Sequence, residues 1–254
     1  MKKKETFLKK KQMLSWEKTA FLDGASVIIG VDEAGRGPLA GPVVAGAVIL
    51  GKTPLEKFRI PVYKEKIDDS KKLRPLEREK AFREIKSKAV SCTGIKDNNY
   101  IDRKNIHMAT LAAMKQAVKK LIAEFCRISN KKEKDIRDNI CILVDGKFGD
   151  FPPYRTIPIV RGDSQSLSIA AASIIAKVTR DGMMDRYDKK YPVYGFSKHK
   201  GYGTKNHLEA IERHGPCLIH RKSFAPIKTI HLHPRGGIKF HPWGGGGNND
   251  ISED

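Results

Sequence analysis

Short runs of β-branched apolar residues predict four strands along this chain. Val27–Val31 and Val43–Leu50 flank a segment rich in glycine and proline, a pattern typical of two strands joined by a loop. Two further runs, Ile140–Val144 and Thr156–Val160, have the length and composition of buried strands. We therefore expect strands in both halves of the chain.

The segments between and after these strands have helical patterns. Pro75 stands at the first position of a helix, which tolerates proline, and the helical stretch runs to about Val90. Between about Asp102 and Cys126, apolar residues recur at spacings of three and four, which places them on one face. We expect that face to pack into the core, and we assign it no function.

Two more helices are predicted in the second half. Asp163 or Ser164 can cap a helix whose apolar positions continue to Val178. Thr204 starts a last helix, which Gly215 stops. Because strands and helices are mixed along most of the chain, we expect a single α/β domain with an appended helical element.

The two ends of the chain differ from this central part. Residues 1–19 hold seven lysines and two glutamates, and we expect a flexible basic arm, although a solubilising end without a task fits equally well. Residues 230–254 contain PRGG, a run of four glycines and an acidic end, a composition typical of a disordered tail. The folded domain is therefore expected to span residues 20–229.

Charge and apolar content restrict the class of protein. The 49 lysines and arginines exceed the 29 acidic residues by 20, and 39% of the residues are hydrophobic, so we expect a folded basic protein. Nucleic acid is the commonest partner of such a protein. The longest uncharged apolar runs, Pro42–Leu50 and Ser168–Ala176, are far shorter than the roughly 20 residues that cross a bilayer. With no secretory signal either, we expect a cytoplasmic protein without membrane contact.

One set of chemically interesting residues follows the first strand. Asp32 and Glu33 are adjacent carboxylates, and the glycine-rich turn with Gly35, Arg36 and Gly37 comes directly after them. A hard cation such as Mg²⁺ would relieve the repulsion between the carboxylates, although an ordinary acidic loop fits the same sequence. The glycine spacing does not match a dinucleotide-binding loop, and a strand follows where that fold needs a helix. The turn instead lets backbone N–H groups approach a ligand closely.

Two more carboxylates stand at comparable places in the pattern. Asp145 ends a buried strand, which is where open α/β sheets bind ligands, although Asp-Gly is also a strong hairpin signal. Asp163 precedes a helix and fits an ordinary N-cap equally well. Together with Asp32 and Glu33, these residues predict a site for two Mg²⁺ ions of the kind that catalyses phosphodiester cleavage.

Five motifs in a fixed order give the chain a specific resemblance. VDEAGRGPLAGPVVAGAVIL is followed by DSKKL at Asp69–Leu73, by VDG, by GDS with SIAAASIIAKVTRD, and by HKGYGT at His199–Thr204. This order resembles bacterial ribonuclease HII over about residues 27–226. The resemblance implies an α/β ribonuclease H-like fold, in which helices flank a central mixed β-sheet and a small helical extension lies at the C-terminal end.

The resemblance also implies roles for individual residues. The family's catalytic, metal-binding acids correspond to Asp32, Glu33, Asp145 and Asp163. Its glycine-arginine-glycine motif, whose backbone contacts the ribose 2′-hydroxyl, corresponds to Gly35, Arg36 and Gly37, and the tyrosine that stacks on the following deoxyribose corresponds to Tyr202. We also count as candidate substrate-binding residues Ser70, Lys71, Lys72 and Lys177. Solvated surface charges explain these lysines nearly as well.

The implied activity is that of an endonuclease with a nucleic acid as its partner. It hydrolyses RNA in RNA–DNA hybrids and the phosphodiester 5′ to ribonucleotides embedded in duplex DNA, and it leaves 3′-hydroxyl and 5′-phosphate ends. Two divalent ions, Mg²⁺ or Mn²⁺, are the expected cofactors, and a monomer is the expected state. One alternative is the sister enzyme ribonuclease HIII, which needs a further N-terminal domain. The other is a non-catalytic nucleic-acid-binding protein whose carboxylates are turn residues.

Overall fold

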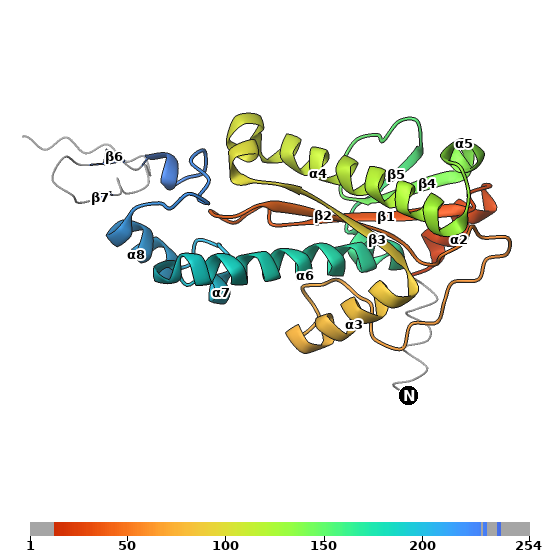
Figure 1. The fold of residues 1–254 in the computed structure, drawn as a ribbon, viewed down its shortest axis with the longest axis horizontal. Helices are drawn as coiled ribbons and strands as arrows, with labels where there is room; N and C mark the ends of the chain where they lie inside the picture. Colours follow the sequence, from red (N-terminus) through yellow and green to blue (C-terminus); the bar gives the residue numbers. More distant parts are fainter. Residues whose placement is uncertain (1–12, 230, 233–237, 240–254) are drawn as a thin grey trace, which may run out of the picture.

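The centre of the molecule is a five-stranded β-sheet (Figure 1). A computed structural model describes residues 13–229, 231–232 and 238–239 of the chain. The strands of the sheet, in chain order, are β1 (Val27–Ala34), β2 (Val43–Ile49), β3 (Val90–Lys96), β4 (Ile140–Asp145) and β5 (Arg155–Ile159). Their order across the sheet is β3-β2-β1-β4-β5, so β1 lies in the middle.

The sheet is mixed, which confirms the expected architecture. β2 pairs antiparallel with both β1 and β3, whereas β4 pairs parallel with both β1 and β5. The four predicted strands are present, and β3 is an additional one that directly follows a helix. Its sequence VSCTGIK has no apolar run, and only Val90 and Gly94 are buried. Pairing with β2, rather than local pattern, makes this segment a strand.

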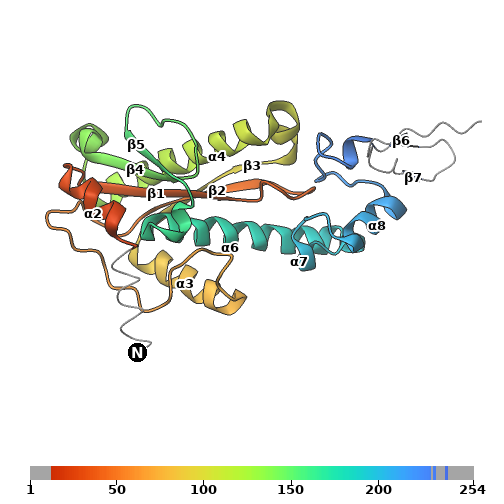
Figure 2. The same ribbon diagram turned by 180° about the vertical axis from the view of Figure 1, so that it is seen from behind.

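Helices cover both faces of the sheet (Figures 1 and 2). On one face, α4 (Asn98–Ser129) packs on β2 and β3, and on the other face α6 (Leu167–Lys190) packs on β1 and β2. A third helix, α3 (Pro75–Lys88), packs against α6. The apolar face predicted between residues 102 and 126 is indeed the buried face of α4, which supplies Met114, Leu121 and Phe125 to the core.

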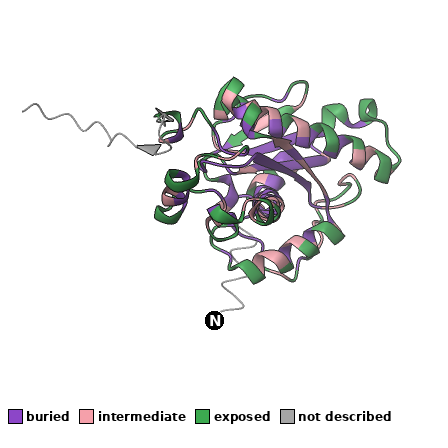
Figure 3. Cartoon of the chain, turned by 60° about the vertical axis from the view of Figure 1, so that its left-hand side comes forward, coloured by how far each residue is buried: buried purple, intermediate pink, exposed green. Residues whose placement is uncertain are grey.

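Glycines in the strands let these helices come close to the sheet. A Cβ atom built on Gly30 would lie 2.1 Å from the backbone of Ser168, and one built on Gly46 would lie 2.3 Å from the carbonyl oxygen of Ala172. Real Cβ atoms do not approach backbone this closely, so any larger residue would push α6 away. The first six residues of β1 and all residues of β2 are buried, and Figure 3 shows buried strands at the centre of the molecule.

The helix boundaries correct one prediction. Neither Asp163 nor Ser164 caps α6, because both lie in a short 3-10 turn, η2 (Gly162–Ser164). The N-cap is Ser166, whose side chain accepts a hydrogen bond from the backbone N–H of Ile169. Asp163 is therefore free of the structural role that competed with its functional one.

The C-terminal part of the domain is helical, as expected. It contains η3 (Pro192–Tyr194), α7 (Phe196–His199), α8 (Lys205–His214) and η4 (Ile227–Thr229). Thr204 caps α8, and Gly215 follows its last residue, in agreement with the sequence pattern. These elements pack at the end of α6 (Figure 1).

The structure describes residues 13–19 of the predicted basic arm, and most of them are not a flexible segment. Residues 15–22 form α2 (Ser15–Leu22), and Glu17 on this helix is buried against α6. The expectation for residues 1–12 lies outside the described residues, as does most of the predicted tail. Within that tail, β6 (His231–Leu232) pairs with β7 (Ile238–Lys239).

A short helical segment connects α4 to β4. It consists of α5 (Glu133–Ile136) and η1 (Arg137–Asn139).

All four cysteines are free, in line with the absence of paired cysteine motifs. Over the residues that the structure describes, there is no helix with the length and apolar character needed to cross a membrane.

Candidate metal centre and nucleic-acid interface

Three carboxylates meet at one edge of the sheet. Asp32 and Glu33 lie near the end of β1, and Asp145 is the last residue of β4. Because these strands are parallel neighbours with Val31 opposite Val144, Asp32 and Asp145 come to the same edge. One ligand oxygen from each of the three residues lies within 4.8 Å of the others. The hairpin alternative for Asp145 is wrong, since the next strand, β5, runs parallel to β4.

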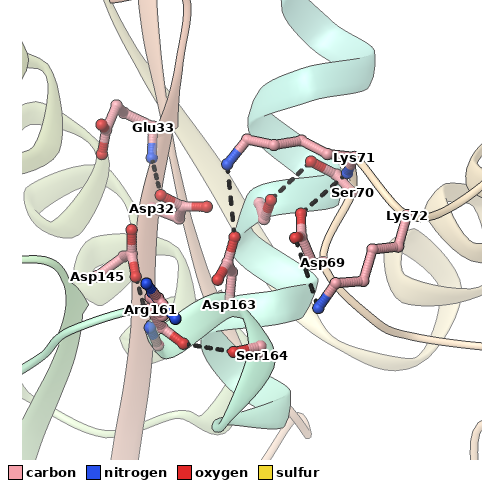
Figure 4. A network of polar contacts seen from close by, with 12 residues as sticks. Asp32, Glu33, Asp69, Ser70, Lys71, Lys72, Asp145, Arg161, Asp163 and Ser164 are labelled. Atoms are coloured by element: carbon pink, nitrogen blue, oxygen red, sulfur yellow. Dashed lines mark hydrogen bonds and ion pairs between the residues drawn. The ribbon is translucent and has the colours of Figure 1, made fainter.

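Asp163 joins this edge from the turn before α6. The backbone N–H of Gly162 donates a 2.6 Å hydrogen bond to Oδ1 of Asp145, which ties the two segments together. Arg161, one residue earlier, has a left-handed backbone (φ 56°) that turns the chain into η2. Figure 4 shows the result, with Asp32, Asp145 and Asp163 grouped between the strands and α6. All four predicted acids thus lie in one region, although Asp163 is outside the compact group of three.

The environment of the acids disfavours their negative charge. Burial, followed by the charges of Glu33 and Asp145, raises the pKa of Asp32 well above its usual value. Burial also raises the pKa of Glu33, where nearby Arg36 acts in the opposite direction. For Asp163, burial comes first and the charge of Asp69 second, and the pKa again rises. A positive charge placed among these groups would reverse the effect.

The donor set fits a hard divalent cation. Oε2 of Glu33 is buried and has no hydrogen-bond partner among the residues that the structure describes, which costs free energy unless another group satisfies it. Oδ1 of Asp32 accepts a hydrogen bond from the N–H of Glu33 at 2.7 Å, and one oxygen of Asp32 lies in the same compact group as those of Glu33 and Asp145. Carboxylate oxygens are the ligands that Mg²⁺ and Mn²⁺ prefer.

Lysines and a fifth acid come from the loop before α3. Nζ of Lys71 lies 3.6 Å from Oδ2 of Asp163, and its side chain is largely exposed (Figure 4). Burial lowers the pKa of Lys71, but Asp163 and Asp69 outweigh it and raise the pKa overall. Nζ of Lys72 lies 3.8 Å from Asp69. Asp69 was not among the predicted site residues, although its place in the DSKKL motif was a usable signal.

Two candidate substrate-binding residues form contacts with other side chains of the protein. The hydroxyl of Ser70 is buried and lies 2.8 Å from the hydroxyl of Ser173, so it holds the loop against α6 instead of facing solvent. Lys177, on α6, donates to Asp181 at 2.8 Å. Arg180, three residues further along α6, is fully buried. Because all three positions are helix or loop residues without a strong pattern, only the packing reveals where their side chains point.

The glycine turn lies against the loop that carries Tyr202. Gly35 has φ +95°, a conformation that favours glycine, while Arg36 and Gly37 are exposed. A Cβ built on Gly37 would lie 3.6 Å from the ring of Tyr202, so the two predicted contacts are neighbours. The two loops are joined by a 2.8 Å hydrogen bond from the N–H of Leu39 to the carbonyl of Gly201.

Comparison with known proteins places this geometry in a family. Residues 29–227 match the family model described as Ribonuclease HII. The chain belongs to the ribonuclease HII family. That membership agrees with the resemblance seen in the sequence, and the match extends from within β1 through α3, α4 and α6 to the start of η4.

Individual relatives support the assignment. A ribonuclease HII of Ruminiclostridium cellulolyticum is 50% identical over 216 residues, which cover 84% of this chain and 75% of the relative. The crystal structure of ribonuclease H2 from Pyrococcus horikoshii OT3 is similar, with a TM-score of 0.56 and 25% identity over 80% of this chain and 96% of that one. Bst-RNase HIII, solved in complex with Mn²⁺, shares the fold, with a TM-score of 0.56 and 19% identity over 82% of this chain and 70% of that one.

Family membership fixes the general activity. As a ribonuclease HII, the chain is a nuclease that hydrolyses RNA in RNA–DNA hybrids, and enzymes of this type use divalent metal ions. The acidic group at the sheet edge is where the described residues offer carboxylates for such ions. The alternative of a ribonuclease HIII is wrong, because the family model and the relative that is 50% identical over 216 residues are both ribonuclease HII.

Proposed function

We propose that this ribonuclease HII also cleaves the phosphodiester 5′ to a single ribonucleotide embedded in duplex DNA. The products would carry 3′-hydroxyl and 5′-phosphate ends, and the enzyme would act as a monomer. The observation that carries the proposal is the juxtaposition of three elements. A group of three carboxylates within 4.8 Å of one another ends β1 and β4, β1 leads directly into the glycine turn, and the turn lies against Tyr202.

Two divalent ions, Mg²⁺ or Mn²⁺, would be held by the acids at the sheet edge: Asp32, Glu33, Asp145 and Asp163. Their carboxylate oxygens and the unpartnered Oε2 of Glu33 support this assignment. The Mn²⁺ complex of Bst-RNase HIII, which has the same fold, is consistent with it. Bound ions of this kind polarise a water molecule for attack on phosphorus and neutralise the charge that develops on the leaving 3′-oxygen.

The glycine turn would recognise the ribonucleotide. Arg36 and Gly37 are exposed, so their backbone N–H groups can reach a ribose 2′-hydroxyl, the group that distinguishes RNA from DNA. Tyr202 is 47% exposed and lies beside Gly37, where its ring can stack on the next sugar along the strand. A ribose followed by a deoxyribose would then occupy both contacts at once.

Lysines around the acidic centre would bind the phosphates. Lys71 and Lys72 are exposed beside Asp163 and Asp69, and the chain as a whole carries a formal charge of +20. Positive charge on the flanks neutralises backbone phosphates, while negative charge at the centre attracts the metal ions. The proposal therefore separates binding, by the lysines, from hydrolysis, by the acids.

A labelled duplex with one ribonucleotide tests the proposal. The duplex is incubated with the protein and Mg²⁺, and the products are resolved at nucleotide resolution. We expect one cut on the 5′ side of the ribonucleotide, a 3′-hydroxyl that a polymerase extends, and no cut in EDTA. A cut on the 3′ side, or hydrolysis of RNA–DNA hybrids alone, would contradict the proposal.

A further inference from the structure

Two arginines are buried behind the glycine turn without a carboxylate partner. Arg180, on α6, is 1% exposed, and Arg221, after α8, is 0% exposed. Within the part of the chain that the structure describes, neither forms an ion pair. Buried charges are normally paired, because leaving water is costly for an ion. These two guanidinium groups bind backbone carbonyl oxygens instead.

Arg221 binds the carbonyls of the glycine turn itself. Its side chain donates to the oxygens of Gly35 at 2.5 Å, Arg36 at 2.8 Å and Gly41 at 3.0 Å. In a trans peptide the C=O and the following N–H point in opposite directions. With the oxygens of Gly35 and Arg36 turned inward onto Arg221, the N–H groups of Arg36 and Gly37 point outward.

Arg180 connects the glycine turn to the Tyr202 loop. It donates to the oxygens of Pro42 at 3.0 Å and Ala40 at 3.2 Å on one side, and to the oxygen of Lys200 at 3.0 Å on the other. Lys200 is two residues before Tyr202. A Cβ built on Gly35 would lie 2.0 Å from Nε of Arg180, so this position in the turn is shaped by the arginine side chain.

We propose that Arg180 and Arg221 are positioning residues that hold the glycine turn and the Tyr202 loop in the relative placement needed to recognise a ribonucleotide followed by a deoxyribonucleotide. This inference rests on the proposed function and deepens it. Arg221 orients the outward N–H groups, and Arg180 sets the separation between those groups and the Tyr202 ring. A planar guanidinium with five donors can bind several carbonyls at once, which an ammonium on a single stem cannot do.

The variant Arg180→Lys tests the inference with the positive charge retained. Lysine can reach carbonyls on one side, but it cannot bridge both loops. We expect kcat on a duplex with a single ribonucleotide to fall about tenfold or more, because small misplacements of substrate are costly. KM should change less than about twofold and hydrolysis of a long RNA–DNA hybrid less than about threefold, since phosphate binding is untouched.

A double-mutant cycle with Tyr202→Ala distinguishes positioning of Tyr202 by Arg180 from a general structural role of Arg180. If Arg180 acts through Tyr202, its replacement in the Tyr202→Ala background should cost much less on the single-ribonucleotide duplex than in the wild type. Val118→Ala, in the buried face of α4, is the control for a general loss of stability. It should lower the melting temperature without changing the ratio of the two activities.

Two results would overturn the inference. One is an equal fold-loss of activity on both substrates for Arg180→Lys, which leaves the ratio of the two activities unchanged. The other is additivity of the two substitutions in the double-mutant cycle. If Arg180→Lys does not fold, Gly35→Ala perturbs the same contact from the turn, and an unchanged ratio in that variant counts against the inference in the same way. Failure of the proposed function is separate, because it appears in the wild type as the absence of 5′ cleavage at a single ribonucleotide.

Discussion

At the scale of single residues, hydrogen bonds from backbone N–H groups determine which carboxylate oxygens remain available to other ligands. Asp145 accepts the N–H of Gly162, and Asp32 accepts the N–H of Glu33, so each retains an oxygen for another ligand. Asp163 lies in a 3-10 turn and does not cap α6. The carboxylates are thus held by short local hydrogen bonds, and their burial raises the pKa of Asp32, Glu33 and Asp163.

Replacing Tyr202 by alanine tests the contact at the junction. Tyr202→Ala should lower kcat/KM on a duplex with one ribonucleotide by about tenfold, in line with the roughly 1–3 kcal/mol found for stacking on an aromatic ring. Activity on a long RNA–DNA hybrid should fall by a smaller factor, because most of its sugars are followed by another ribose. Steady-state kinetics on the two substrates measure this difference. Equal losses would exclude a junction-specific contact for Tyr202.

The sequence predicted that four acids come together, but it did not predict all of their neighbours. The acids stand at strand ends and in turns, where a pattern can be recognised, and the structure brings them to one edge. Asp69 stands in the DSKKL motif, but only the structure shows that its loop lies beside Asp163. The hydroxyl of Ser70 is buried on Ser173, a contact between residues 103 positions apart that no local signal predicts.

At the scale of elements, α2 and α6 form a unit beside the acidic centre. Oε1 of Glu17 accepts hydrogen bonds from the hydroxyls of Ser166 and Ser168, at 2.6 and 2.8 Å, and from the N–H of Ser168 at 2.8 Å. The N–H of Leu167 also donates to the carbonyl of Met13. Glu17 therefore satisfies the N-terminal turn of α6, only three residues after Asp163.

Replacing Glu17 by alanine should destabilise the protein. The variant leaves a buried N–H and two buried hydroxyls without their acceptor, and we expect a loss of about 2–4 kcal/mol in the free energy of unfolding. Urea unfolding followed by circular dichroism measures it. Lys18→Ala, on the exposed side of α2, is the matched control and should change the free energy by less than about 0.5 kcal/mol. A Glu17→Ala variant as stable as this control would show that the hydrogen bonds of Glu17 do not stabilise the fold.

Elements with a strong internal pattern were predictable, and elements fixed by their partners were not. The apolar face of α4, the proline of α3 and the β-branched runs of β1, β2 and β4 are local signals. The helix α2 was taken for part of a basic arm, because its Glu17 and Lys18 look solvated in the sequence. Its order depends on burial of Glu17 against α6, a contact between positions 149 residues apart.

The C-terminal helical element contains a buried pair of histidines. Nε2 of His207 lies 3.1 Å from Nε2 of His220, and Nδ1 of His207 lies 2.8 Å from the carbonyl of Tyr202. Burial, above all, lowers the pKa of both histidines to about 4. In the unfolded chain a histidine titrates near pH 6.5, so the unfolded state binds more protons between pH 6.5 and pH 4.

The two histidines should therefore make the folded state less stable as the pH falls through this window, whereas the raised pKa values of the buried acids act in the opposite direction. We expect the contribution of these histidines to the free energy of unfolding to drop by on the order of 4 kcal/mol between pH 7 and pH 5, about 2 kcal/mol for each. Urea titrations across the range measure the dependence. The His207→Gln variant should show a shallower slope than the wild type, because one of the two groups no longer titrates. If the free energy of unfolding depends on pH in the same way in both proteins, the lowered pKa of His207 does not contribute to the pH dependence.

At the scale of the whole molecule, charge and topology act together. The chain carries an excess of 20 positive charges, yet its mixed sheet gathers acids from positions 32, 33, 145 and 163 at one edge. The parallel pairing of β1 with β4 makes this possible, since the ends of both strands come to the same side. The order of the sequence motifs indicated the fold, whereas the arginines behind the glycine turn became visible only in three dimensions.

Cleavage by the Asp32→Asn variant is the most direct test of the acidic centre. A duplex with one ribonucleotide is incubated with Mg²⁺ and either the wild type or the variant, and binding is measured in parallel by fluorescence anisotropy. We expect cleavage to fall by about 10³-fold or more while the affinity for the duplex stays within about threefold, because the lysines bind the phosphates. A variant that cuts at a rate near that of the wild type would remove Asp32 from the centre and contradict the account.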